Sequence, residues 1–171
     1  MTIIEAFSGA GLEISEAQAA QFQALFEFMI EYNKSVNLTS ITEFEDVVQK
    51  HYIDSVLPFA RLEIPEGASI IDVGTGAGFP SLPLLIFRPD LRGTLCDSLR
   101  KRCVYLEKAC TKIGISAEII HGRGEELGRK MRERFDFATA RAVAAMPILT
   151  ELCLPFVKVG GMFVALNYVN E

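Results

Sequence analysis

The segment around the glycine-rich loop at residues 72–78 constrains the fold of this chain more than any other. Residues 69–73 form an apolar stretch typical of a buried strand, and the following loop carries Gly74, Gly76 and Gly78, which permit positive φ and close approach of backbone amides to a ligand. Pro80 then suits the first turn of a helix, because its fixed φ is helical. A strand, a glycine loop and a helix in this order predict a nucleotide-cofactor site at the carboxyl end of a strand.

The remainder of the C-terminal part alternates between short apolar strands and helical stretches. Such alternation requires parallel pairing and right-handed crossovers between the strands. We therefore expect an α/β fold with a doubly wound, mostly parallel, Rossmann-like sheet. The expected strands cover residues 69–73, 93–97, 117–121, 135–139 and 162–166, and the expected helices cover residues 80–87, 99–113, 125–132 and 147–157.

A helical segment is expected before the sheet. Ser15 and Gln18 have the spacing of a capping box and predict a helix that runs to about residue 32. A second box at Thr42 and Glu45 predicts another helix, which Pro58 should stop. The turn at residues 65–67 then divides the chain into an N-terminal helical segment, residues 1–64, packed on a core of residues 65–171.

Length and composition limit the class of protein. A chain of 171 residues with 50% hydrophobic side chains fits one soluble globular domain. It has no apolar run of about 20 residues and no signal peptide, so we expect a cytoplasmic protein that does not contact a membrane. Because the 4 cysteines include no C-x-x-C pair and only 2 histidines are present, we expect neither a metal site nor a disulfide framework.

The neighbours of the glycine loop favour a nucleoside ligand over a dinucleotide. The glycines follow the pattern G-x-G-x-G, and Phe79 stands where a dinucleotide fingerprint has its last glycine. Asp72 ends the first strand and Asp97 ends the second, where a carboxylate can accept both hydroxyls of a ribose. S-adenosylmethionine fits better than a nicotinamide cofactor, because it has no pyrophosphate and its positive charges favour carboxylate and carbonyl oxygens. A nicotinamide dehydrogenase and a glycine turn without a ligand are the alternatives.

The net charge of -5 hides a segregation of the basic side chains. Residues 1–87 carry 3 basic side chains against 12 acidic ones, whereas residues 88–171 carry 14 basic against 10 acidic. Phosphate binding depends on local clusters of Lys and Arg, so an acidic total does not exclude a nucleic-acid partner. The basic runs at residues 100–102 and 129–134 are therefore either phosphate contacts or solvated helix faces.

Six motifs occur in the order expected of one family. They are residues 37–39, 50–55, 72–80, 97–102, 122–126 and 140–144. In these motifs the chain resembles the GidB/RsmG methyltransferases, which make 7-methylguanosine in bacterial 16S ribosomal RNA, and the resemblance covers about residues 37–166. It implies a class I methyltransferase fold, S-adenosyl-L-methionine as the cofactor, and 16S ribosomal RNA or the small ribosomal subunit as the partner. We expect a monomer.

The resemblance also implies roles for single residues. Gly74 and Phe79 would contact the cofactor, Gly124 and Glu125 would border its adenine, and Arg141 would lie beside it as a candidate for positioning the reactants. The basic side chains that would face RNA are Lys101, Arg102, Arg123 and Arg141. For Arg123 and Arg141 the alternative is a salt bridge with Glu125 or Asp136. His51 and Asp54 belong to a family motif, and capping, packing and substrate contact are all open to them.

The implied chemistry requires no acid or base. Guanine N7 has an in-plane lone pair and no proton to lose, so methyl transfer can proceed by direct displacement, with catalysis from positioning. Methylation of exocyclic amines usually goes with an N/D-P-P-Y/F loop, which residues 140–143 lack. Methylation of pyrimidine C5 needs a nucleophilic cysteine, and Cys153 lies inside an expected helix and is interpreted as structural.

Two departures from the family pattern affect what we expect of the C-terminal strands and of the activity. Residues 167–168 read Asn-Tyr where family members normally have Lys-Gly, and the chain stops where such a sheet usually continues through a helix and two further strands. We therefore expect a fold with truncated C-terminal strands and one exposed flank of the sheet. Two further functions stay open: a cofactor- or RNA-binding module without turnover, and a methyltransferase for another small substrate.

Overall fold

A parallel sheet forms the centre of the computed structural model, which describes residues 1–141 and 144–166. Its strands are β1 (Ser69–Val73), β2 (Arg92–Asp97), β3 (Ala117–His121), β4 (Phe135–Arg141) and β5 (Val157–Leu166). The order across the sheet is β3-β2-β1-β4-β5, and all neighbours pair in parallel. The chain therefore moves outward from β1 to β3 and returns to β4 on the other side of β1. The prediction of a doubly wound parallel sheet is confirmed.

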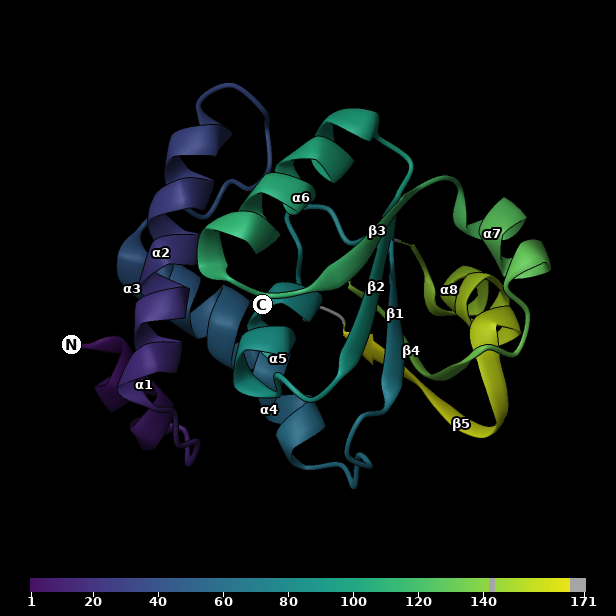
Figure 1. Ribbon diagram of the computed structural model, residues 1–171, viewed down its shortest axis with the longest axis horizontal. Helices are drawn as coiled ribbons and strands as arrows, with labels where there is room; N and C mark the ends of the chain where they lie inside the picture. The colour runs from purple at the N-terminus through teal and green to yellow at the C-terminus, as the bar shows by residue number, and fades with distance from the viewer. Residues whose placement is uncertain (142–143, 167–171) are drawn as a thin grey trace.

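Helices cover both faces of this sheet (Figure 1). One face carries α5 (Ser81–Phe87) and α6 (Arg100–Ile113), and the other carries α7 (Gly124–Lys130), α8 (Met146–Cys153) and the short 3-10 turn η2 (Leu154–Phe156). Because successive side chains of a strand point to opposite faces, β1 contributes to two hydrophobic clusters. Ile70 belongs to the cluster that contains Leu106, and Ile71 belongs to the one that contains Leu149.

The N-terminal helices pack on the side of α5 and α6 (Figure 1). They are α1 (Ile3–Gly9), α2 (Glu16–Asn33), α3 (Phe44–Asp46), the π-helix η1 (Val47–Ile53) and α4 (Asp54–Ala60). A row of aromatic rings joins them to the glycine loop: Phe7 to Phe22 at 4.9 Å, Phe22 to Tyr52 at 4.9 Å, and Tyr52 to Phe79 at 6.3 Å between centroids. The N-terminal helices thus share one hydrophobic cluster with the sheet. The division at residues 64 and 65 stays a prediction.

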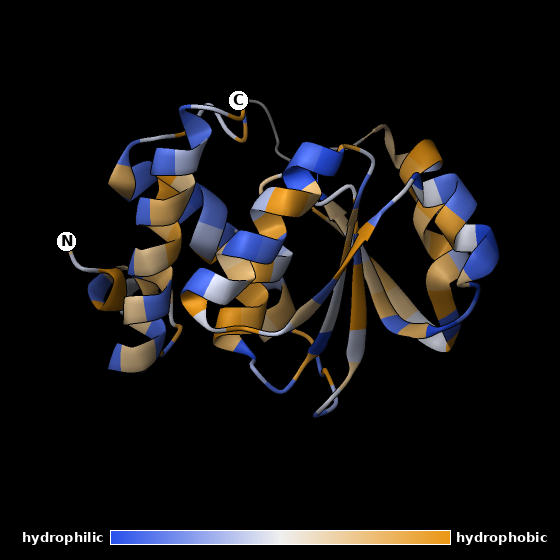
Figure 2. Ribbon diagram, turned by 45° about the horizontal axis from the view of Figure 1, so that its top comes forward, coloured by the Kyte–Doolittle hydropathy of each residue, from blue (hydrophilic) through white to orange (hydrophobic). Residues whose placement is uncertain are grey.

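Hydropathy follows these layers. In Figure 2 the strands are largely hydrophobic, whereas the helices carry both hydrophobic and hydrophilic positions. In β1 all the residues are buried, as expected for a strand covered on both faces. In α6 the buried side chains recur at helical spacing, with Leu106, Ala109 and Ile113 on one side.

Several N-terminal boundaries differ from those expected. The capping box of Ser15 and Gln18 forms with both of its hydrogen bonds, as predicted. The box predicted at Thr42 is wrong, because the cap of α3 is Glu43 and its side chain makes no capping bond. Pro58 lies inside α4 and does not stop it; the buried Phe59 holds the last turn against the core. Helix α1, with its own box of Thr2 and Glu5, was not predicted.

The last strand is longer than expected. It begins at Val157 and not at residue 162, and α8 ends at Cys153. The pairing of β4 with β5 shifts register between Phe135 and Phe137, which accommodates the additional residues of β5. Gly160 has a φ of +85°, and a Cβ at Gly161 would lie 2.5 Å from the carbonyl oxygen of Asp136, so glycines allow the strand to bend there.

Two findings concern what the described residues contain. No helix among them is long and apolar enough to cross a membrane. All four cysteines, Cys96, Cys103, Cys110 and Cys153, are free and buried. The Asn-Tyr departure at residues 167–168, and residues 142–143 of the last family motif, lie outside the described residues.

Candidate functional site

The glycine loop is fixed to the end of β2 by hydrogen bonds. The carbonyl oxygen of Cys96 accepts the N–H groups of Gly74 at 2.9 Å and Thr75 at 3.1 Å. The Asp97 carboxylate accepts the N–H of Gly76 on Oδ2 and the N–H of Leu99 on Oδ1, both at 2.9 Å. Gly76 has a φ of +60°, where other residues are strained, and a Cβ there would have no described atom within 4 Å. The loop therefore presents an open backbone surface.

A cavity of about 460 Å³ lies in front of this loop, and we call it the β1/β4 cavity. It occupies the carboxyl ends of β1 and β4, where the strand order reverses and where ligands bind in open α/β sheets. The residues lining it come from the glycine loop (Gly74, Thr75, Gly76, Ala77, Phe79), from the end of β2 and the start of α6 (Asp97, Ser98, Arg102), from β4 (Arg141), and from the N-terminal segment (Leu38, Thr39, His51).

Most of the residues predicted from the loop motif line this cavity. Gly78 and Asp72 are not among its lining residues and instead support the loop. A Cβ at Gly78 would lie 2.4 Å from Cδ1 of the buried Leu82, and its φ is +94°. The glycine at this position therefore permits close packing of the loop on α5.

Asp72 is completely buried beneath the loop. Its Oδ2 accepts hydrogen bonds from the Thr75 hydroxyl at 2.8 Å, the Ser81 hydroxyl at 2.8 Å and the Ser81 N–H at 3.3 Å. Its Oδ1 has no hydrogen-bond partner among the described residues. Burial raises the pKa of Asp72 to about 7, although the three donors and Arg141 act in the opposite direction. Asp72 thus offers an unused acceptor that a cation would satisfy.

Gly124 and Glu125 do not line the β1/β4 cavity among the described residues. They open α7 and border a separate hollow of about 360 Å³ between α7 and α8. Gly124 nevertheless lies against the end of β1, since a Cβ there would be 3.0 Å from Cγ1 of Val73. Their expected place beside an adenine stays a prediction.

The basic residues expected to face RNA divide into two kinds. Lys101 and Arg123 are exposed at the amino-terminal ends of α6 and α7, directly after β2 and β3. Arg102 is half-buried beside the cavity, with Nη1 at 3.8 Å from Oδ2 of Asp97. Arg102 is therefore placed to balance the Asp97 charge, whereas Lys101 and Arg123 are open to solvent.

Arg141 is held by the N-terminal segment. Its Nη2 donates to the carbonyl oxygen of Lys50 at 2.6 Å, its Nη1 lies 3.3 Å from the Ser55 hydroxyl, and its guanidinium carbon lies 5.7 Å from the centroid of Phe79. Burial lowers the pKa of Arg141 to about 10, so the side chain stays charged at neutral pH. The predicted alternative partner, Asp136, bonds to Ser69 and Lys158.

Comparison with known proteins decides which family has this site. The family model of GidB, rRNA small subunit methyltransferase G, matches residues 18–169. The chain is 48% identical over 167 residues to ribosomal RNA small subunit methyltransferase G of an Exiguobacterium species, covering 96% of this chain and 70% of that protein. It is 49% identical over 160 residues to the protein of the same name from Clostridium beijerinckii, covering 92% of this chain and 67% of that protein. The chain belongs to the GidB family.

Solved structures support the fold of this GidB family member. An S-adenosyl-L-methionine-dependent methyltransferase from Methanococcus maripaludis superposes with a TM-score of 0.61 at 16% identity, covering 83% of this chain and 62% of that one. A methyltransferase of Haloferax volcanii, solved with the activator Trm112, gives a TM-score of 0.58 at 19% identity, covering 80% and 58%. At these identities the comparison establishes the class I methyltransferase fold.

Reasoning from the loop motif did not assign the N-terminal wall of the cavity, formed by Leu38, Thr39 and His51. These residues lie in two of the family motifs, residues 37–39 and 50–55. The motifs mark these residues as candidates for the site but do not indicate what each side chain does there. His51 stacks on Phe79, with centroids 4.3 Å apart and planes inclined by 12°. Of the roles open to His51 from the sequence, the structure supports packing beside the site.

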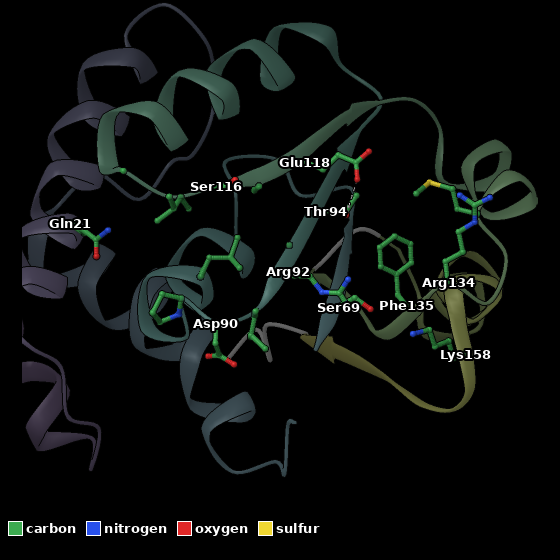
Figure 3. Close-up of a pocket in the computed structure, with 18 residues that line it drawn as sticks. Gln21, Ser69, Asp90, Arg92, Thr94, Ser116, Glu118, Arg134, Phe135 and Lys158 are labelled. Atoms are coloured by element: carbon green, nitrogen blue, oxygen red, sulfur yellow. Dashed lines mark hydrogen bonds between the residues drawn. The ribbon is translucent and has the colours of Figure 1, made fainter. Parts of the chain in front are cut away.

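A larger cavity, of about 730 Å³, lies at the other end of the strands (Figure 3). Its lining includes the first residues of the strands, such as Ser69, Arg92 and Phe135, together with Glu118 and Lys158. Ligands of parallel α/β sheets bind at the carboxyl ends, so the size of this cavity does not make it the reaction site of a GidB protein.

Proposed function

We propose that this chain transfers a methyl group from S-adenosyl-L-methionine to N7 of a guanosine in bacterial 16S ribosomal RNA. The observation that carries the proposal is the β1/β4 cavity, with the open loop at Gly76 beside Asp97, in a member of the rRNA small subunit methyltransferase G family. We further propose that the chain acts as a monomer in the cytoplasm, where ribosomal subunits are its partners.

The residues around the cavity fit this cofactor. Oδ1 of Asp72 is a buried acceptor without a partner among the described residues, and the cofactor carries an ammonium and a sulfonium. Each oxygen of Asp97 accepts one backbone N–H and retains lone-pair capacity for ribose hydroxyls. The open space over Gly76 lets the ligand touch backbone, and Phe79 lines the same cavity. We therefore assign cofactor contacts to Gly74, Gly76, Phe79, Asp97 and Arg141, with Asp72 and Gly78 supporting them.

The reaction needs positioning from these residues. The cofactor, when bound, supplies an electrophilic methyl group on sulfur. Guanine N7 has a free lone pair, so no side chain has to remove a proton, and the work of the chain is to hold N7 about 3 Å from the methyl carbon and in line with the sulfur. Arg141 is suited to this because its guanidinium is charged, anchored by Lys50 and Ser55, and exposed to the cavity.

RNA would approach over the carboxyl ends of the strands. Lys101 and Arg123 stand there at the starts of α6 and α7, on opposite faces of the sheet, and both are exposed. Their charges lie in the basic half of the chain, which carries 14 basic side chains against 10 acidic ones. A surface of this kind binds phosphates without reading sequence, so it would place the substrate while the cavity selects the guanine.

Small ribosomal subunits from a strain without the modification provide the test. The chain is incubated with them and labelled S-adenosyl-L-methionine, and the RNA nucleosides are analysed by mass spectrometry. We expect 7-methylguanosine with the wild type, none with Asp97→Ala, and unchanged yield with Lys112→Ala, which alters an exposed residue at the far end of α6.

The same experiment separates the alternatives. Cofactor binding by calorimetry without any methylated guanosine would support a binding module without turnover. Methylation of a small molecule but not of the subunit would support another methyltransferase. Absence of cofactor binding by a folded sample refutes the proposal.

A further inference from the structure

His51 connects two residues that border the β1/β4 cavity, yet the methyl transfer described above gives it no task. Its ring stacks on Phe79 with centroids 4.3 Å apart, and its Nδ1 lies 3.2 Å from Nη2 of Arg141. Only 6% of His51 is exposed, although the residue lines the cavity. A single side chain therefore contacts both an aromatic and a cationic residue of the cavity wall.

The hydrogen bonds of His51 define its tautomer. A guanidinium has donors and no acceptor, so Nδ1 of His51 must accept from Arg141 and can carry no proton. The ring proton then belongs to Nε2, which lies 2.9 Å from the Thr39 hydroxyl oxygen and donates to it. Burial and the neighbouring Arg141 lower the pKa of His51 to about 4, which agrees with a neutral ring.

Thr39 is itself fixed by a short network in the loop after α2. Its hydroxyl oxygen also accepts the N–H of Ile41 at 3.1 Å. Oδ1 of Asn33 accepts the N–H groups of Leu38 at 2.8 Å and Thr39 at 3.1 Å, and Nδ2 of Asn33 donates to the Thr39 carbonyl at 3.0 Å. The loop thus holds the acceptor that keeps the proton of His51 on Nε2.

The π-helical backbone under His51 completes the arrangement. The seven residues of η1 form wider turns than an α-helix, a geometry that is rare and often found at functional sites. Two of the groups that contact Arg141 belong to this segment: the carbonyl of Lys50 and the ring of His51. A third, the hydroxyl of Ser55, lies in the following helix α4 and donates a hydrogen bond to the carbonyl of His51. Among the described residues, the charge that acts on His51 is that of Arg141 from β4, and Arg141 is in turn influenced by the carboxyl groups of Asp54 from α4 and Asp72 from β1.

We propose that His51 is a positioning residue of the methyltransferase site, which as a neutral Nε2–H imidazole fixes the Arg141 guanidinium and the Phe79 ring and couples both to Thr39. This inference rests on the proposed function. In this role His51 acts through Arg141 and Phe79, which also line the cavity, and not on the reacting atoms themselves. The N-terminal segment is therefore part of the binding site and not only a cover for the sheet.

Binding and kinetics of matched variants test the proposal. Calorimetry with S-adenosyl-L-methionine and methylation of unmodified subunits are measured for wild type, His51→Ala, His51→Asn, Thr39→Val and Gln49→Ala. Asparagine can place an amide oxygen near the position of Nδ1, so it restores an acceptor for Arg141 without the stacked ring. Gln49 is exposed on the same π-helix and serves as the control.

We expect His51→Ala to raise the cofactor Kd and KM by about 10- to 100-fold, as for loss of a hydrogen bond to a charged group. His51→Asn should recover part of this loss, Thr39→Val should raise Kd by about 3- to 10-fold, and Gln49→Ala should match the wild type. The salt dependence of RNA binding should be the same in all of them. Equal Kd for wild type and His51→Ala, or no difference between the Ala and Asn variants, would overturn the proposal.

The tautomer gives a readout that needs no variant of His51. In the wild type labelled with 15N-histidine, NMR at pH 7 should show His51 with an unprotonated Nδ1 and a protonated Nε2, with His121 assigned by His121→Gln. A proton on Nδ1, or averaging between tautomers, would refute the hydrogen-bond scheme even if His51→Ala failed to fold. If the wild type binds no cofactor, the proposed function fails and the inference fails with it; if it binds and His51→Ala binds equally well, only the inference fails.

Discussion

Replacement of Asp72 by asparagine tests the electrostatics of the buried carboxyl beneath the glycine loop. The carboxyl is completely buried, three donors share Oδ2, and Oδ1 has no partner among the described residues. Burial raises its pKa from the ordinary 3.8 to about 7. A difference of this size corresponds to ~4 kcal/mol of free energy between the protonated and ionised forms of the folded protein.

Whether Asp72 stabilises or destabilises the fold at a given pH depends on whether the folded or the unfolded chain binds its proton more tightly. Between pH 3.8 and about 7 the folded chain keeps Asp72 protonated while the unfolded chain does not. The contribution of Asp72 to the free energy of unfolding is therefore full below pH 3.8 and is lost as the pH rises to about 7, by up to ~4 kcal/mol. Asp72→Asn cannot ionise, so this fall should be absent. His51, whose lowered pKa changes stability in the opposite direction, is present in both proteins and cancels in the difference.

Two measurements check this reasoning. Urea unfolding of wild type and Asp72→Asn at intervals from pH 4 to pH 8 should give curves that diverge as the pH rises, with the variant relatively more stable at the alkaline end. Calorimetry at pH 6 in buffers of different ionisation enthalpy should show that the wild type releases close to one proton on binding the positively charged cofactor, whereas the variant binds more weakly and releases none. Parallel stability curves, together with heats that do not depend on the buffer, would refute the argument.

Three further predictions concern the loop and the basic surface. Gly78→Ala should lower the free energy of unfolding by ~2–4 kcal/mol in urea titrations, because the new methyl would overlap Leu82 and the φ of +94° disfavours a side chain. Gly76→Ala has open space and should cost only ~1 kcal/mol of stability while weakening cofactor binding by calorimetry at least about tenfold. The double variant Lys101→Ala/Arg123→Ala should reduce the salt slope of RNA binding by about two, and Lys112→Ala should leave it unchanged; an equal slope in all three proteins contradicts the RNA surface.

Local sequence signals predicted those parts of the fold that depend on neighbouring residues. The strand at residues 117–121 has the expected bounds, and α6 ends where Gly114 adopts the left-handed conformation with a φ of +71°. The capping box of Ser15 and the glycine loop also form as expected. In each case the side chain that sets the structure lies within a few residues of the backbone it controls.

Features that depend on distant contacts were missed. The π-helix and the passage of α4 through Pro58 require the core that buries Tyr52 and Phe59, and the periodicity of the segment does not contain that information. The bend in β5 depends on the closeness of Gly161 to the backbone of Asp136, a contact between two strands, so the start of the strand was expected at residue 162 and not at Val157.

For the site, the motif identified which residues gather around the loop but not what holds them. Asp97 was expected to bind a ribose, and it also carries the backbone of Gly76 and Leu99. Arg141 was expected beside the cofactor or in an ion pair, and its anchors are a carbonyl and two side chains of the N-terminal segment. No spacing rule relates positions so far apart in the chain, so only the folded structure reveals these contacts.

The contact between Arg141 and the carbonyl of Lys50 joins positions separated by 91 residues, which has a consequence for biosynthesis. At a synthesis rate of roughly 5–20 residues per second, Arg141 is added on the order of 5–20 s after Lys50. During that interval the nascent N-terminal helices lack both the complete sheet and the guanidinium that ties them to it. The glycine loop is translated before β4, so a nascent chain has the loop sequence well before it has a complete cavity. Competence to bind the cofactor therefore arises late in synthesis, after the fourth strand has left the ribosome.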